Sequence, residues 1–229
     1  MSDVLIQLDN VTMMYQNLIA VDHVSLSIEK GDFLVIAGEN GSGKTTLMKG
    51  ILGLKPLQSG KITYPGVTPN KIGYLPQVIE IQKDFPASVM EVVLSGYVNQ
   101  LNHRVLYPKS FKKKALQNLK LLEIDHLVNT SFRNLSGGQR QRVLLARALC
   151  ATETIIFLDE PVASLDVNIT KSLFELLGEL NRKHGITIVM ITHDVSDIIN
   201  HSTKVLRMNT QIDFYGSSDA YRHQFGGLD

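Results

Sequence analysis

Short apolar runs separated by turns divide the chain into predicted strands and helices. Near the amino terminus, apolar side chains alternate or cluster over a few positions, as in strands, at residues 4–8, 11–15 and 24–28. Residues 33–37, 154–158 and 186–191 are almost continuously apolar and predict strands buried on both faces of a sheet. Two further strands are expected at 61–64 and 71–75.

Helical periodicity marks other parts of the chain. Helices are predicted at 44–52 and at 168–184, where Gly185 stands at the expected stop position. From 77 to about 151 the pattern is helical, with candidates at 89–98 and 110–122. In the latter, we expect one side to carry Leu116, Leu119 and Leu122. Lys112–Lys114 lie on the opposite side, as a solvated face or a binding patch.

This alternation of strands and helices predicts a mostly parallel α/β sheet interrupted by a helical insertion. A chain of 229 residues fits one domain or two intimately packed lobes. The formal net charge of +1 provides no general attraction to nucleic acid, and we expect no nucleic-acid partner. The single cysteine, Cys150, follows apolar residues and is expected to be a buried, inert thiol.

No stretch of the sequence resembles a membrane anchor. The first ten residues lack the basic and apolar regions of a signal peptide. The chain also lacks an apolar run of about 18 residues, the length that predicts a membrane-spanning helix. If the protein serves transport across a bilayer, other chains are expected to form the pore.

Residues 38–45 match the phosphate-loop pattern G-x-x-x-x-G-K-[ST], between a predicted strand and a predicted helix. Glycines let backbone N–H groups approach phosphates, and the start of the helix adds its positive dipole end. Lys44 is expected to reach the β- and γ-phosphates, and the Thr45 hydroxyl to bind Mg²⁺. The residues expected to hold the nucleotide are Gly38, Asn40, Gly41, Ser42, Gly43, Lys44, Thr45 and Thr46. A chance glycine-rich turn is the alternative.

Two carboxylates follow the buried strand at 154–158. In parallel sheets, ligands gather at the carboxyl ends of the strands, where Asp159 and Glu160 stand. We expect Asp159 to hold Mg²⁺ through water and Glu160 to polarise the attacking water. Taken alone, the motif is also compatible with a strand that ends in solvent-exposed acids.

A third motif is Leu135-Ser136-Gly137-Gly138-Gln139. Ser136 is a typical residue at the start of a helix, and the helix is expected to run through Val143 and Leu149. The free N–H groups there and the Ser136 hydroxyl form a second phosphate-binding surface. One chain does not need two such surfaces for a single triphosphate. An ordinary glycine turn is the less favoured reading.

In their order along the chain, these motifs resemble those of ATP-binding-cassette (ABC) ATPases, over nearly the whole sequence. The resemblance implies a P-loop NTPase core with a mostly parallel sheet, an antiparallel β subdomain and an inserted helical subdomain. Residues 1–229 then form a single ATPase domain. Its nucleotide-binding core comprises 1–77 and 152–229, and its helical subdomain 78–151.

The resemblance also assigns residues whose types alone are uninformative. Tyr15 matches the aromatic residue that stacks on adenine, and Gln77 the glutamine that senses Mg²⁺ and water. His193 matches the switch histidine at the γ-phosphate. Asp166, in Ser164-Leu165-Asp166, matches the loop that contacts the opposite subunit. A cross-strand aromatic pair, a loop amide and a structural histidine are the plain alternatives for Tyr15, Gln77 and His193.

In mechanism, the resemblance implies ATP and Mg²⁺ bound between two copies of the chain, with Ser136, Gly137, Gly138 and Gln139 of one facing Lys44 of the other. It further implies a peripheral ATPase at the cytoplasmic face of a membrane. The expected partners are permease subunits and, indirectly, an extracytoplasmic solute-binding protein.

The run at 83–93, with Phe85-Pro86, is most similar to zinc- and manganese-uptake ATPases. A rigid apolar corner there would receive the permease, although a simple helix-start turn explains the same residues. We expect no extra carboxyl-terminal domain of the kind that sugar- and methionine-importer ATPases carry. An iron-chelate or cobalamin importer, or a soluble iron–sulfur assembly ATPase, is the alternative. A phosphate-loop kinase would have no use for Ser136–Gln139.

Overall fold

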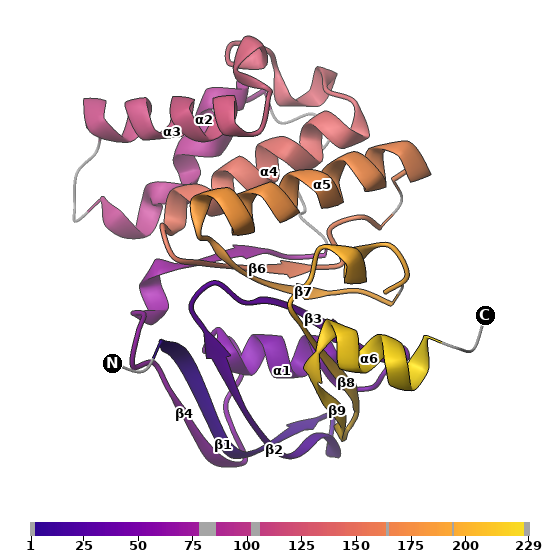
Figure 1. The fold of residues 1–229 in the computed structure, drawn as a ribbon. Coiled ribbons are helices and arrows are strands. Elements are labelled where there is room, and N and C mark those ends of the chain that lie inside the picture. The colour runs from indigo at the N-terminus through magenta and orange to yellow at the C-terminus, as the bar shows by residue number, and fades with distance from the viewer. Residues whose placement is uncertain (1–2, 78–85, 102–105, 164, 194, 227–229) are drawn as a thin grey trace.

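The computed structural model of the protein describes residues 3–77, 86–101, 106–163, 165–193 and 195–226. Its centre is a six-stranded sheet in the order β5-β6-β7-β3-β8-β9 (Figure 1). The strands are Phe33–Ala37 (β3), Ile72–Leu75 (β5), Ile155–Asp159 (β6), Thr187–Ile191 (β7), Lys204–Asn209 (β8) and Gln211–Ser217 (β9). Neighbouring strands run parallel except β9, which is antiparallel to β8. The predicted mostly parallel α/β sheet is confirmed.

Both faces of this sheet are covered, which explains its continuous apolar strands. In β3, Phe33 and Val35 join the core cluster shared with the helices Gly137–Ala151 (α4) and Val167–His184 (α5). Leu34 and Ile36 join a second cluster with Lys44–Ile51 (α1) on the opposite side. Successive side chains of a strand point to opposite faces, so a strand covered twice must be apolar at every position. All residues of β3, β6 and β7 are buried.

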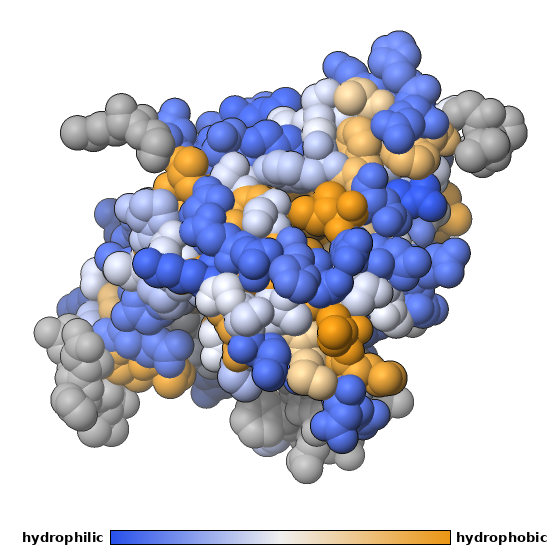
Figure 2. Space-filling model, turned by 90° about the horizontal axis from the view of Figure 1, so that it is seen from below, coloured by the Kyte–Doolittle hydropathy of each residue, from blue (hydrophilic) through white to orange (hydrophobic). Residues whose placement is uncertain are grey.

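A smaller antiparallel sheet, ordered β2-β1-β4, covers the other side of α1. Its strands are Val4–Tyr15 (β1), Leu18–Glu29 (β2) and Ser59–Thr63 (β4). The prediction of two strands at 4–8 and 11–15 was wrong. The structure joins them into one strand, because a register shift between Leu8 and Val11, with a positive φ of 49° at Asn10, absorbs the polar interruption. The face seen in Figure 2 is largely hydrophilic, with separate hydrophobic patches.

The helical insertion lies between β5 and β6, which pair directly with each other. It contains Val89–Leu94 (α2), Lys109–Leu121 (α3) and α4, and α2 continues as a 3₁₀ helix, Ser95–Gln100 (η2). The predicted helix at 89–98 therefore changes its winding after Leu94. Glycine is required in η2, because a Cβ at Gly96 would lie 2.1 Å from the Arg147 carbonyl oxygen of α4.

The predicted apolar side of α3 needs one correction. Leu119 and Leu122 are fully buried, but Leu116 is 36% exposed. The buried stripe instead contains Ala115, one helical turn before Leu119. A spacing of three from 116 to 119 therefore placed Leu116 on the wrong side of the helix. The lysines of the same helix are exposed, as expected.

The carboxyl-terminal elements were not predicted. β8 and β9 form a hairpin, and Ser218–Phe225 (α6) follows. Cys150 is buried, and burial raises the pKa of its thiol, in agreement with an inert cysteine. Among the described residues, no helix combines the length and the apolar character needed to cross a bilayer.

Candidate functional site

The phosphate loop connects the end of β3 to the start of α1, and its glycines are required by direct contact. Gly43 has a φ of 95°, and a Cβ on it would lie 2.0 Å from the carbonyl oxygen of Ala20. At Gly38 a Cβ would lie 2.3 Å from the carbonyl oxygen of Met208. Real Cβ atoms do not approach backbone oxygens so closely. The loop can therefore close only with glycine at both positions, and α1 begins directly after it with free N–H groups.

The Lys44 side chain lies inside this loop and is only 5% exposed. Its ammonium group donates to the carbonyl oxygens of Gly38 at 2.7 Å and Glu39 at 2.6 Å. A longer contact of 3.3 Å reaches the Ser42 hydroxyl. Burial lowers the pKa of Lys44, and the nearby carboxylates of Glu160 and Asp159 oppose this shift. A cation held in this way is positioned to meet an anionic ligand at the start of the helix.

The two carboxylates predicted after β6 face this loop in different environments. Asp159 is 2% exposed and accepts a hydrogen bond from the Thr45 hydroxyl at 3.4 Å. Burial raises the pKa of Asp159, and the bond from Thr45 partly offsets that shift. Glu160 has a left-handed φ of 48°, which is uncommon outside glycine. Its carboxylate accepts a bond of 2.6 Å from the Gln77 side-chain amide.

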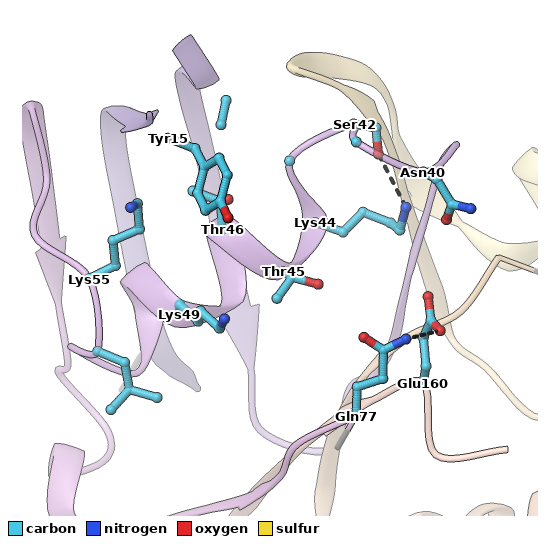
Figure 3. Close-up of a pocket in the computed structure, with 14 residues that line it drawn as sticks. Tyr15, Asn40, Ser42, Lys44, Thr45, Thr46, Lys49, Lys55, Gln77 and Glu160 are labelled. Atoms are coloured by element: carbon cyan, nitrogen blue, oxygen red, sulfur yellow. Dashed lines mark hydrogen bonds between the residues drawn. The ribbon is translucent and has the colours of Figure 1, made fainter. Parts of the chain in front are cut away.

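A cavity of about 480 Å³ opens over the loop (Figure 3), within the range of roughly 300–1,000 Å³ common for small-molecule sites. Gln77 and Glu160 face Lys44 across it, and Tyr15 lines another side. The predicted site residues that line it are Tyr15, Asn40, Gly41, Ser42, Gly43, Lys44, Thr45, Thr46, Gln77 and Glu160. Gly38 and Asp159 join them through the hydrogen bonds to Lys44 and Thr45.

Sequence reasoning missed two lysines of this cavity, Lys49 and Lys55. Lys49 follows Thr45 by one turn of α1, so helical periodicity had placed both on one side. The Lys55 ammonium lies 5.2 Å from the centre of the Tyr15 ring, within cation–π distance. That contact joins segments far apart in sequence, and no local pattern indicates it.

The Ser136–Gln139 segment lies elsewhere and does not line this cavity. As predicted, Ser136 starts helix α4. Its hydroxyl accepts from the Gln139 N–H at 3.3 Å, and the Gln139 side chain accepts from the Ser136 N–H at 2.9 Å. Gly138 packs against α5, where a Cβ would lie 2.8 Å from Ile169. This helix start is exposed and carries a capping box.

Asp166 and His193 also lie outside the lining of the nucleotide cavity. Asp166 starts α5, and its carboxylate accepts from the Ile169 N–H at 3.0 Å. His193 is exposed after β7 and borders a second hollow, together with Asn40 from the far side of the phosphate loop. Phe85 of the expected permease corner, Ser164 and Asp194 lie outside the described residues.

The donor atoms of the cavity fit a nucleotide triphosphate with Mg²⁺. The Thr45 hydroxyl and Asp159 carboxylate lie together, and the Gln77 amide is nearby, so the available ligands are the oxygen atoms that Mg²⁺ prefers. Within the described ranges, no group of three or more His, Cys, Asp or Glu could hold a metal ion by itself.

The fold and the loop define a phosphate-loop nucleotide-binding protein. The chain belongs to the ABC transporter family, whose sequence profile matches residues 21–163. It is 35% identical to the zinc uptake system ATP-binding protein ZurA of Listeria innocua, over 96% of this chain and 88% of that protein. It is also 35% identical to the manganese transport system ATP-binding protein MntB of Listeria monocytogenes, over 92% and 89% of the two chains.

Solved structures agree with this assignment. A nucleotide-free ATP-binding cassette from an ABC transporter superimposes with a TM-score of 0.85 at 26% identity, covering 98% of this chain and 95% of the other. The cassette MJ0796 in a dimeric post-hydrolysis state, bound to ADP and Pi, gives 0.74 at 28% identity, covering 93% and 98%. The expected ABC ATPase fold is confirmed, and the chain is an ATP-binding ATPase of this family.

Proposed function

We propose that the chain is the ATP-hydrolysing subunit of an importer for a divalent metal ion, zinc or manganese. The observation that carries the proposal is the cavity in which the phosphate loop meets the Gln77–Glu160 pair. That geometry supports hydrolysis, and the names of the zinc and manganese relatives support the cargo. The ion is the cargo of the permease and not a ligand of this site.

The active form is a two-fold dimer with two ATP sites. Ser136, with the N-terminal end of α4, is exposed and does not line the cavity of its own chain, so it is free to bind phosphate held by another copy. In a two-fold dimer each chain then supplies one half of each site. The dimeric cassette among the similar structures supports this arrangement. Asp166 would face the partner copy.

In hydrolysis, each residue of the site has a distinct role. Lys44 holds the β- and γ-phosphates, and His193 contacts the γ-phosphate after the dimer closes. Glu160 accepts the proton of the attacking water, while Gln77 holds its carboxylate in place. Thr45, Gln77 and Asp159 would hold Mg²⁺, which neutralises phosphate charge when it is bound. Tyr15 stacks on adenine, and Gly38, Asn40–Gly43 and Thr46 bind phosphate with the helix start.

In the cell, the chain would lie at the cytoplasmic face of the membrane through its permease subunits. The helical subdomain, residues 78–151, stands between the core segments 1–77 and 152–229 and would receive the permease. An extracytoplasmic solute-binding protein would deliver the ion. No observation favours the iron-chelate, cobalamin or iron–sulfur assembly alternatives over a metal importer.

The test is metal uptake by cells whose only copy of the gene carries Glu160→Gln. We expect uptake of radioactive Zn²⁺ or Mn²⁺ to fall to background, while uptake of iron chelates and cobalamin is unchanged. Tagged Glu160→Gln protein is purified in detergent from the same membranes with ATP present. A polytopic membrane protein should co-purify with it in equal amount. Lys44→Ala, which should bind ATP poorly, is the matched control for the effect of ATP on this purification.

Two results contradict the proposal. Normal metal uptake with lost iron-chelate or cobalamin uptake would assign the subunit to a different importer. Soluble partners alone, with no membrane protein in the purified complex, would assign it to an assembly function.

A further inference from the structure

The outer side of α3 carries a stripe of exposed lysines and leucine. Residues 109, 112, 113, 116 and 120 recur at i, i+3, i+4, i+7 and i+11, which places them on one side of the helix. All are exposed, while Ala115 and Leu119 on the other side are fully buried. In Figure 1, α3 lies at the outer edge of the helical insertion. We define the basic face of α3 as Lys109, Lys112, Lys113, Leu116 and Lys120.

The positive charge of this face is not compensated locally. The sequence has no aspartate or glutamate between Glu91 and Glu123, although the whole chain is nearly neutral at +1. Within the described ranges, no ion pair involves a lysine of the basic face. Lys114, which points away from that face, pairs with Glu153. A neutral protein has therefore concentrated positive charge on one helix face.

Apolar side chains are also exposed on α3 and on the segments that precede it in the sequence. Leu106 is 81% exposed and Leu116 is 36% exposed, and Val98 in the preceding η2 is 55% exposed. Tyr97 of η2 stacks on Phe111 of α3 with ring centres 4.3 Å apart, so the two segments form one unit. Exposed leucine and valine interspersed with lysine, without acidic residues, is the composition of protein surfaces that lie at a membrane interface.

We propose that the basic face of α3 contacts anionic phospholipid headgroups of the membrane that holds the permease. This rests on the proposed function, which places the subunit beside that membrane. Lysine ammonium groups bind lipid phosphates, and their methylene stems and the two leucines reach the apolar boundary beneath. A nucleic acid would use the lysines but would leave Leu106 and Leu116 without a partner, so lipid explains more of the surface.

The experiment measures sedimentation of the full chain with vesicles of phosphatidylcholine alone or mixed with phosphatidylglycerol. We expect binding only to the anionic vesicles, and release when NaCl is raised from about 0.1 M to 0.5 M, because screening shortens the range of the charges. Each lysine near an anionic surface strengthens binding roughly five-fold. The triple variant Lys109→Gln, Lys112→Gln, Lys113→Gln should therefore lose at least about ten-fold in partitioning.

The matched control replaces three other exposed lysines, Lys30, Lys61 and Lys171, by glutamine and changes the net charge equally. This control should bind vesicles as the parent does, and both variants should keep the parental ATPase rate. Equal loss in both variants, or equal binding to neutral vesicles, would overturn the proposal. So would a selective loss of binding to a single-stranded RNA probe with vesicle binding intact. If the chain does not bind vesicles but metal uptake is normal, the lipid contact is refuted and the proposed function is unaffected.

Discussion

The two proposed phosphate-binding surfaces of this chain are built in different ways. We call the loop at Gly38–Gly43 the enclosed half, because Ser42, Gly43 and the following Lys44 are buried and the Gln77–Glu160 pair lines the same cavity. The helix start at Ser136 is exposed, and its polar groups bond mainly to each other. The first surface has the Glu160 carboxylate beside it, and the second lines no part of the same cavity. In the proposed function, a single chain therefore contains one catalytic half and a separate binding half.

This difference predicts two kinds of effect when residues are substituted. Residues of the enclosed half act within one chain, so their substitution should affect binding and chemistry directly. Residues of the exposed half should matter only when two chains meet. The variants below test that distinction, beginning with the largest expected effect.

Replacing Glu160 by Gln removes the proton acceptor but keeps its shape and the neighbouring Gln77. We expect steady-state ATP hydrolysis to fall by about 10²-fold or more, while ATP binding is retained. Phosphate release and equilibrium binding of a fluorescent ATP analogue measure the two quantities. An unchanged hydrolysis rate would remove Glu160 from the catalytic role.

Replacing Ser136 by Arg blocks the exposed half, and replacing Lys44 by Ala disables the enclosed half. Each variant alone should lose hydrolysis, because each two-fold dimer then contains two defective sites. Mixing the two variants should restore about a quarter of the parental activity, since half of the dimers are mixed and each has one intact site. Turnover of mixed samples across a range of ratios measures this recovery.

The control for the mixing experiment mixes two single variants, Lys44→Ala and Glu160→Gln. Both changes lie in the enclosed half, so every site of a mixed dimer carries one of them and no activity should return. Recovery in this control, or none with the Ser136 variant, contradicts a site shared between chains.

Replacing Tyr15 by Leu tests base recognition within the enclosed half. Stacking of a base on an aromatic ring contributes roughly 1–3 kcal/mol, so KM for ATP should rise by about 5- to 150-fold with little change in kcat. Tyr15→Phe keeps the ring and should behave like the parent. Inhibition by tripolyphosphate, which has no base, should be equal in all three proteins, and a change there would mean that Tyr15 acts on the phosphate loop.

The smallest expected effect is on stability. Burial raises the pKa of Asp159, so the folded chain binds that proton more tightly than the unfolded chain. This contribution to the free energy of unfolding declines as pH rises above the ordinary carboxyl pKa of about 3.9. Asp159→Asn should abolish the decline and raise Tm at neutral pH, although it lowers Mg²⁺-dependent hydrolysis. Thermal melts without nucleotide across this pH range measure the effect, and an unchanged pH slope would contradict it.

Sequence alone was sufficient where the signal is local. The buried strands β3, β6 and β7, the phosphate loop and the start of α4 each follow from a short pattern of apolar residues, glycines or a capping serine. The carboxyl-terminal hairpin was missed because its partly exposed strands alternate weakly, with no residue of β9 fully buried. Leu116 was misplaced because a spacing of three residues defines the side of a helix only loosely.

The residues of the site also divide into those that a local pattern predicts and those that it does not. The residues of the phosphate loop lie together as its motif indicates, but Lys49 and Lys55 line the cavity through tertiary packing. The catalytic and metal-binding roles assigned to Gln77, Asp159, Glu160 and His193, and the boundaries of the helical subdomain, stay predictions. The roles are defined by contacts with the nucleotide, with the ion and, for His193, with the closed state, which neither a local pattern nor the fold determines.

The close approach of Gly43 to the Ala20 carbonyl has a consequence for selectivity by length. The β1–β2 hairpin carries Tyr15 at its tip and is pressed against the phosphate loop by this contact. The Tyr15 end and the phosphate-loop end of the cavity are therefore held at a fixed spacing. A nucleotide contacts both ends only if its base and its terminal phosphates are that far apart. A shorter molecule, such as a nucleoside monophosphate, can contact only one end at a time.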